Sequence, residues 1–211
     1  MDNYFETLDA KTAYILGALI LNIKLTEKNV ILVNDMIKYI LQVSEMRRSE
    51  IEKKRYLPDY DEQVEEDLLL EIDEENDLIA SLHQTILSIV IKYKSAYIPL
   101  FTSSEIYTLI EPMLHETRSL DNQLAAVCII ADVIEHGAHP LTSLLQNIVS
   151  KFYPKVCNCA QKTDYLPLKQ AAMFGIGSCA KAFGSHFIPV APSAIKFLGN
   201  YITETVNTTE Q

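Results

Sequence analysis

The sequence lacks the segments that would carry a chain into or across a membrane. No apolar run free of charged or polar interruption reaches the roughly eighteen residues that a membrane-spanning helix needs. The N-terminus has Asp2 and Glu6 among its first residues, and therefore lacks the basic start of a secretory signal. We expect a soluble, intracellular chain with no membrane partner.

Basic residues are also scarce. The 211 residues hold 18 Lys and Arg against 28 Asp and Glu, which gives a formal net charge of −10. A surface that binds nucleic acid needs clustered Lys and Arg to neutralise phosphates. This balance argues against a nucleic-acid partner, and it favours either basic protein partners or plain solubility.

Cysteine is limited to Cys128, Cys157, Cys159 and Cys179. The Cys157-x-Cys159 spacing fits neither the Cys-x-x-Cys of a zinc knuckle nor a redox pair. We interpret all four as reduced, small core residues.

Signals for catalysis are missing as well. No glycine-rich phosphate loop occurs, and His136 and His139 do not have the spacing of a metalloenzyme motif. Asp132 and Glu135 are three residues apart and are more simply one polar edge of a helix, with His136 at its end. We expect no enzymatic activity, no cofactor and no metal site.

What the sequence does have is helical periodicity. Apolar residues make up 48% of the chain and recur at helical spacing, with no competing strand pattern. This pattern predicts an all-α fold. The expected helices span about residues 3–22, 27–55, 77–98, 103–115, 120–136, 141–160, 164–184 and 190–205.

The stretch 164–184 is rich in small residues. Asp164 is a good N-cap and Pro167 is tolerated in a first helical turn. Gly175 and Gly177 each cost about 1 kcal/mol relative to alanine inside a helix, which indicates close packing against neighbours. Residues 123–126 line up with 169–172 at an offset of 46 residues, which falls in the range of HEAT and armadillo repeats.

These features together predict a right-handed α-solenoid of about four HEAT-like antiparallel helix pairs. A globular helical bundle is the other possible arrangement. The expected divisions are a first helix pair (1–55), an acidic insertion (56–77), three further pairs (78–117, 118–161 and 162–206) and a frayed tail (207–211).

An abrupt change of composition follows Pro58. The segment from Asp59 to Asp77 holds eleven carboxylates and no Lys or Arg. One interpretation is a solvated, mobile loop, part of which is helical because Val64, Leu68 and Ile72 recur every four residues. The other is a docking element for a basic surface. Its residues are Asp59, Asp61, Glu62, Glu65, Glu66, Asp67, Glu71, Asp73, Glu74, Glu75 and Asp77.

Three stretches carry a resemblance to a known family. Residues 59–66 after a long basic-ended helix, then 132–136, then 169–177, resemble segments of the karyopherin-β nuclear transport receptors in the same order and approximate spacing. Lys169 departs from the pattern, because family repeats usually place Arg there. The resemblance implies a HEAT-repeat superhelix, of which this chain would be an internal or C-terminal-half segment.

The resemblance also implies partners. Family members bind Ran-GTP, cargo with basic localisation segments and Phe-Gly nucleoporins, and they shuttle between cytoplasm and nucleus. The acidic insertion would then be a Ran or cargo contact. The alternative is a HEAT scaffold subunit of another multiprotein complex, which predicts the same helices. In either case, exposed solenoid ends would favour self-association of the isolated chain.

Overall fold

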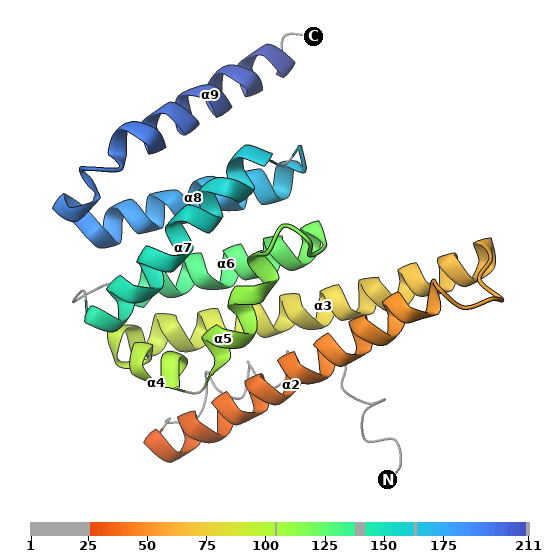
Figure 1. The fold of residues 1–211 in the computed structure, drawn as a ribbon. Coiled ribbons are helices and arrows are strands. Elements are labelled where there is room, and N and C mark those ends of the chain that lie inside the picture. Colours follow the sequence, from red (N-terminus) through yellow and green to blue (C-terminus); the bar gives the residue numbers. More distant parts are fainter. Residues whose placement is uncertain (1–25, 104, 138–141, 163, 210–211) are drawn as a thin grey trace. The chain divides into compact units, whose positions relative to one another are not determined.

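The structure of the protein is a computed structural model that describes residues 26–103, 105–137, 142–162 and 164–209 (Figure 1). All regular structure in these ranges is helical, so the all-α prediction is confirmed. The helix expected at 3–22 lies outside the described residues. None of the described helices is long and apolar enough to cross a membrane. The chain falls into two compact units, Met1–Pro112 and Met113–Gln211, and each is described by itself.

The first unit is dominated by a long antiparallel hairpin of α2 (Glu27–Lys54) and α3 (Glu62–Tyr93). The Asp61 carboxylate caps α3 by accepting a hydrogen bond from the Val64 N–H at 2.9 Å. The turn between the helices lies at the far end of the hairpin from α4 (Ile98–Ser103) and α5 (Ile106–Ile110) in Figure 1.

The start of α3 corrects two expectations. The helix expected from Asp77 begins fifteen residues earlier, at Glu62. The interpretation of 59–77 as a mobile loop is therefore wrong from Glu62 onward, where the segment is helical throughout and not only in part. The reason is that Leu68, Glu75 and Leu78 continue one buried face. Carboxylates in the first turn, such as Glu62 and Glu65, also favour a helix N-terminus.

The helix expected at 103–115 is observed as two shorter pieces, α5 and a 3-10 turn η2 (Glu111–Leu114) that contains Pro112. Before them, another 3-10 turn, η1 (Lys94–Ala96), leads from α3 into α4. Glu105, at the start of α5, has a positive φ of 63°. Such a backbone conformation cannot continue a right-handed helix from α4.

The second unit packs α8 (Leu166–Phe183) against both α6 (Leu120–Gly137) and α7 (Ser143–Lys162). The predicted N-cap of α8 is wrong. Tyr165 takes that position, so Asp164 lies one residue too early, while Pro167 does occupy the first turn.

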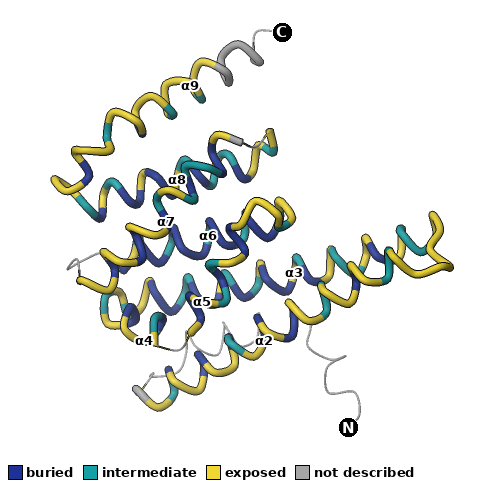
Figure 2. The backbone as a smooth tube through the Cα atoms, viewed as in Figure 1, coloured by how far each residue is buried: buried dark blue, intermediate teal, exposed yellow. Residues whose placement is uncertain are grey.

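The last helix of the second unit, α9 (Ala191–Thr209), follows a 3-10 turn η3 (Gly184–Phe187). Figure 2 shows α6, α7 and α8 with buried stripes, while α9 is exposed along most of its described length. Ile195, Leu198 and Ile202 are among its exposed side chains. The α9 helix therefore presents an open apolar face.

The same turn ends one long helix in each unit. Lys94 after α3 has φ 49° and ψ −133°, and Gly184 after α8 has φ 51° and ψ −122°. In both, the backbone N–H donates to the carbonyl four residues earlier, and a 3-10 turn follows. Buried Tyr97 and Phe187 then lie three residues on. Residues 94–99 and 184–189 thus form one repeated element that the sequence analysis missed.

Candidate functional site

The inner faces of α2 and α3 meet through pairs of opposite charge. The Lys54 ammonium lies 2.7 Å from both oxygens of Glu71. Arg47 donates to Glu75 at 3.1 Å, and Arg48 donates to the side-chain oxygen of Asn76 at 2.9 Å. These pairs are nested around the turn, as an antiparallel hairpin requires.

The pair nearest the turn is the most elaborate. The Arg55 guanidinium donates two hydrogen bonds to Glu65, at 2.9 and 3.1 Å, and the Tyr60 hydroxyl donates a third at 2.7 Å. The bonds from Arg55 and then Tyr60 hold the pKa of the Glu65 carboxyl below its ordinary value. Accepting from Arg55 and Tyr60 makes Glu65 part of the hairpin's own structure.

The basic end of α2 therefore forms ion pairs with the first half of α3. It neutralises the inner carboxylates of α3: Glu65, Glu71 and Glu75. Glu75 is only 5% exposed and faces α2. The sequence signal was a basic run before the turn and an acidic run after it, and the two runs were interpreted separately.

The remaining carboxylates of the acidic segment lie on the outside of the hairpin. Asp61 is exposed and serves as the N-cap of α3. Within the described part of the chain, the other seven are exposed and form no ion pair. They are Asp59, Glu62, Glu66, Asp67, Asp73, Glu74 and Asp77. We call these seven residues the outer carboxylates. Their concentration gives the hairpin a negative outer surface.

Two large apolar side chains interrupt this surface. Leu69 is 49% exposed and Leu70 is 65% exposed. Because residues three and four apart are neighbours on a helix, both leucines lie one turn after Glu66 and one turn before Asp73. The outer face of α3 is therefore mixed in character, with an apolar centre between carboxylates.

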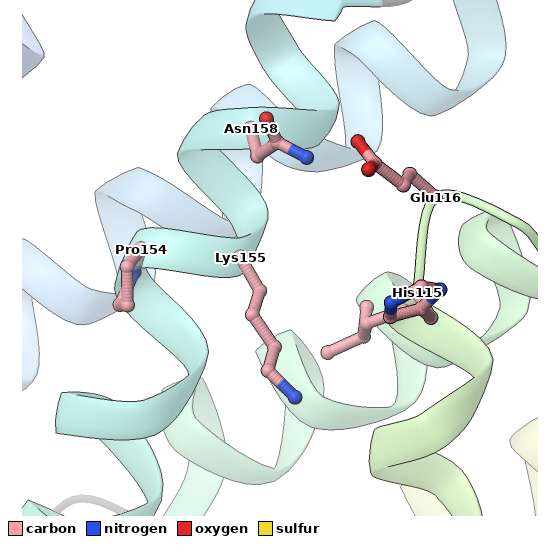
Figure 3. A pocket seen from close by; sticks show the side chains of 6 residues that line it. His115, Glu116, Pro154, Lys155 and Asn158 are labelled. Atoms are coloured by element: carbon pink, nitrogen blue, oxygen red, sulfur yellow. The ribbon is translucent and has the colours of Figure 1, made fainter.

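A pocket of about 300 Å³ with a mixed polar and apolar lining lies within the second unit (Figure 3). Leu114, His115 and Glu116 line it from the segment before α6, and Pro154, Lys155 and Asn158 line it from α7. The His115 Nδ1 is hydrogen-bonded to the Thr117 hydroxyl at 2.8 Å. Among its lining residues there is no cysteine, serine or threonine, so the pocket offers no thiol or hydroxyl nucleophile.

The cysteines are free thiols, and Cys159 and Cys179 are buried while Cys128 and Cys157 are partly buried. Burial raises the pKa of Cys128 to about 11 and that of Cys179 to about 12, which keeps both thiols protonated at neutral pH. A search of the described residues finds no group of three or more His, Cys, Asp and Glu side chains that could hold a metal ion. His139 lies outside those residues.

The chain is similar to a known protein family and to a curated protein. Residues 14–116, just under half of the chain, match the model of the family described as Importin repeat 6. This range includes the whole α2/α3 hairpin. The chain is also 24% identical over 166 residues to the probable importin-5 homolog of Dictyostelium discoideum, in a match that covers 79% of this chain and 15% of that protein.

The α2/α3 hairpin lies within the residues that match the Importin repeat 6 model. Together with the all-α fold, they confirm the predicted resemblance to the karyopherin-β, or importin-β, family. The chain spans only about 15% of the length of the relative from Dictyostelium.

Proposed function

We propose that this chain is a non-catalytic segment of a nuclear transport receptor, and that the outer carboxylates of the α2/α3 hairpin form a binding surface for a basic partner. The partner would be Ran-GTP or cargo with a basic localisation segment. The match of residues 14–116 to an importin repeat supports the transport role. The observation that carries the binding surface is that seven carboxylates on this hairpin remain exposed and outside its ion pairs.

The charge arrangement favours an external partner over internal stabilisation. Like charges spaced four apart on one helix face repel one another, and this repulsion costs the hairpin a few tenths of a kcal/mol per pair. A cationic partner would relieve that repulsion and would be drawn in by the long-range field.

Within a transport receptor, the chain would shuttle between cytoplasm and nucleus, and other apolar surfaces would contact Phe-Gly nucleoporins. The open apolar face of α9 would let the isolated chain self-associate.

A pull-down tests the proposal. The immobilised chain is incubated with Ran loaded with GTP or GDP, and separately with a basic localisation peptide. We expect retention of Ran-GTP over Ran-GDP, or of the peptide. Binding should weaken as salt rises beyond roughly 0.15 M, where the Debye length falls to about 8 Å.

A matched pair of variants locates the surface. Changing Glu62, Glu66 and Asp73 to their amides should weaken retention, since these side chains are exposed. Changing Glu71 to Gln should have a smaller effect, because it removes a single charge from the inner side of the hairpin, where Glu71 contacts Lys54 and not the partner. Unchanged retention in the triple variant would remove the outer carboxylates from the site. Absence of any Ran or basic-peptide binding would favour the scaffold of another complex.

A further inference from the structure

In the α2/α3 hairpin, α2 covers the inner face of α3, which is rich in carboxylates. On the inner face, Leu68 is 1% exposed and lies among the paired carboxylates of that side. The element seated on it is α2, whose end places the buried Ile51 between basic residues. On the inner side of the hairpin, a face of α3 that combines carboxylates with a leucine is thus covered by an amphipathic basic helix.

The outer face of α3 repeats the combination without a cover. Leu69 and Leu70 are exposed, and Glu66 and Asp73 lie one helical turn to either side of them. Electrostatic attraction alone would leave Leu69 and Leu70 exposed to water, whereas a partner helix with an apolar stripe would bury them.

We propose that this outer face is a docking site for a cationic amphipathic helix, one that inserts apolar side chains against Leu69 and Leu70 and places Lys or Arg beside the flanking carboxylates. This inference rests on the proposed function and specifies the partner of the same surface: basic charge alone is not enough. A second copy of the same face is disfavoured as the occupant because its carboxylates would repel these.

The test uses two fluorescein-labelled synthetic peptides of equal length and equal charge. One carries Leu and Lys at the spacing of an amphipathic helix, and the other replaces each Leu by Ser. Binding to the chain is followed by fluorescence anisotropy at about 0.1 M salt, where exposed charges still attract over roughly 10 Å. We expect the Leu-containing peptide to bind at least about tenfold more tightly, since burying one leucine is worth that much or more.

Three variants separate the contributions. Replacing Leu69 and Leu70 by Gln should remove the preference for the Leu-containing peptide and leave the Ser-containing peptide unaffected. Replacing Glu66 and Asp73 by their amides should weaken both peptides. A control that replaces the exposed Ile195 by Gln on α9 should change neither. Circular dichroism verifies that each variant keeps its helix content.

The outcomes distinguish the two claims. If the amide variant weakens both peptides but the leucine variant changes neither, the amphipathic partner is refuted and the acidic surface stands. If the amide variant changes neither peptide, the outer carboxylates do not bind cations, and the proposed function fails with them. If the control on α9 removes the preference, the apolar contact lies elsewhere on the chain and this inference is overturned.

Discussion

The two glycines of α8 provide a sharp test of how the second unit is packed. Both lie inside the helix, but their surroundings differ. A Cβ built on Gly175 would lie 3.1 Å from the Val156 Cγ2 and 3.2 Å from the Phe152 Cζ. A Cβ on Gly177 would meet nothing within 4 Å. Alanine at the first position must therefore push the Val156 and Phe152 side chains of α7 back by a few tenths of an ångström, and at the second it points into open space.

The magnitudes follow from this geometry. Replacing a helical glycine by alanine stabilises the helix by about 1 kcal/mol. Gly177→Ala should gain most of that amount. At Gly175 the added methyl presses on Phe152 and Val156, which are both 0% exposed and belong to the core. Overpacking of a dense core costs about 1–3 kcal/mol, so Gly175→Ala should be neutral to about 2 kcal/mol destabilising.

Urea denaturation followed by circular dichroism measures both variants against the parent chain. The two units can unfold separately, so amide hydrogen exchange along α8 should accompany the midpoint and assign the change to the second unit. We expect Gly177→Ala to raise the midpoint and Gly175→Ala to lower it or leave it unchanged. Equal stabilisation by both substitutions would refute the close approach of α7 and α8 at Gly175.

Three further substitutions test the first unit by the same denaturation assay. Lys94→Gly should stabilise it by about 1 kcal/mol, because a side chain is strained at this backbone conformation; a lower midpoint would contradict the turn. Tyr97→Phe should cost about 1–3 kcal/mol, since the buried Tyr97 hydroxyl donates to the Asn34 Oδ1 at 3.1 Å; no loss would mean that this bond does not form. The Glu65 carboxyl, whose pKa is lowered chiefly by Arg55, contributes stability above its unfolded pKa of about 4.3. That contribution should disappear as the pH falls through the lower folded value. The stability gap between the parent and Glu65→Gln should therefore close in acid, and a gap that stays constant would contradict the hydrogen bonds.

The sequence predicted the helices of the second unit well because their apolar periodicity is dense and their ends are marked. The helix expected at 120–136 is observed as Leu120–Gly137, for example. The prediction was least accurate at α3, where the dense negative charge of 59–77 favoured a loop although Val64, Leu68 and Ile72 indicated that part of it is helical. The helix is continuous because Leu68, Glu75 and Leu78 form one buried face, and the hairpin also pairs Arg55 with Glu65, a contact that no local pattern shows.

The glycines of α8 were predicted in part. Close packing against a neighbouring helix explains Gly175 but not Gly177. Sequence periodicity places both inside one helix, yet it cannot tell which one faces α7. The repeated turn at Lys94 and Gly184 did have a sequence signal, since residues 95–99 and 185–189 share a Ser, an aromatic residue, Ile and Pro at the same positions. The capping residue itself differs between the two copies, although the conformation is the same.

The length and continuity of α3 have a mechanical consequence. Its 32 residues form a rod about 48 Å long. The half near Tyr93 is packed in the apolar core, where Ile86, Ile89 and Val90 are nearly inaccessible to solvent. The half near Glu62 carries the outer carboxylates of the helix. A force applied near Glu62 would be transmitted along this continuous helix to its buried half near Tyr93. A partner that binds at the turn of the hairpin could therefore affect the packing of residues about 48 Å away.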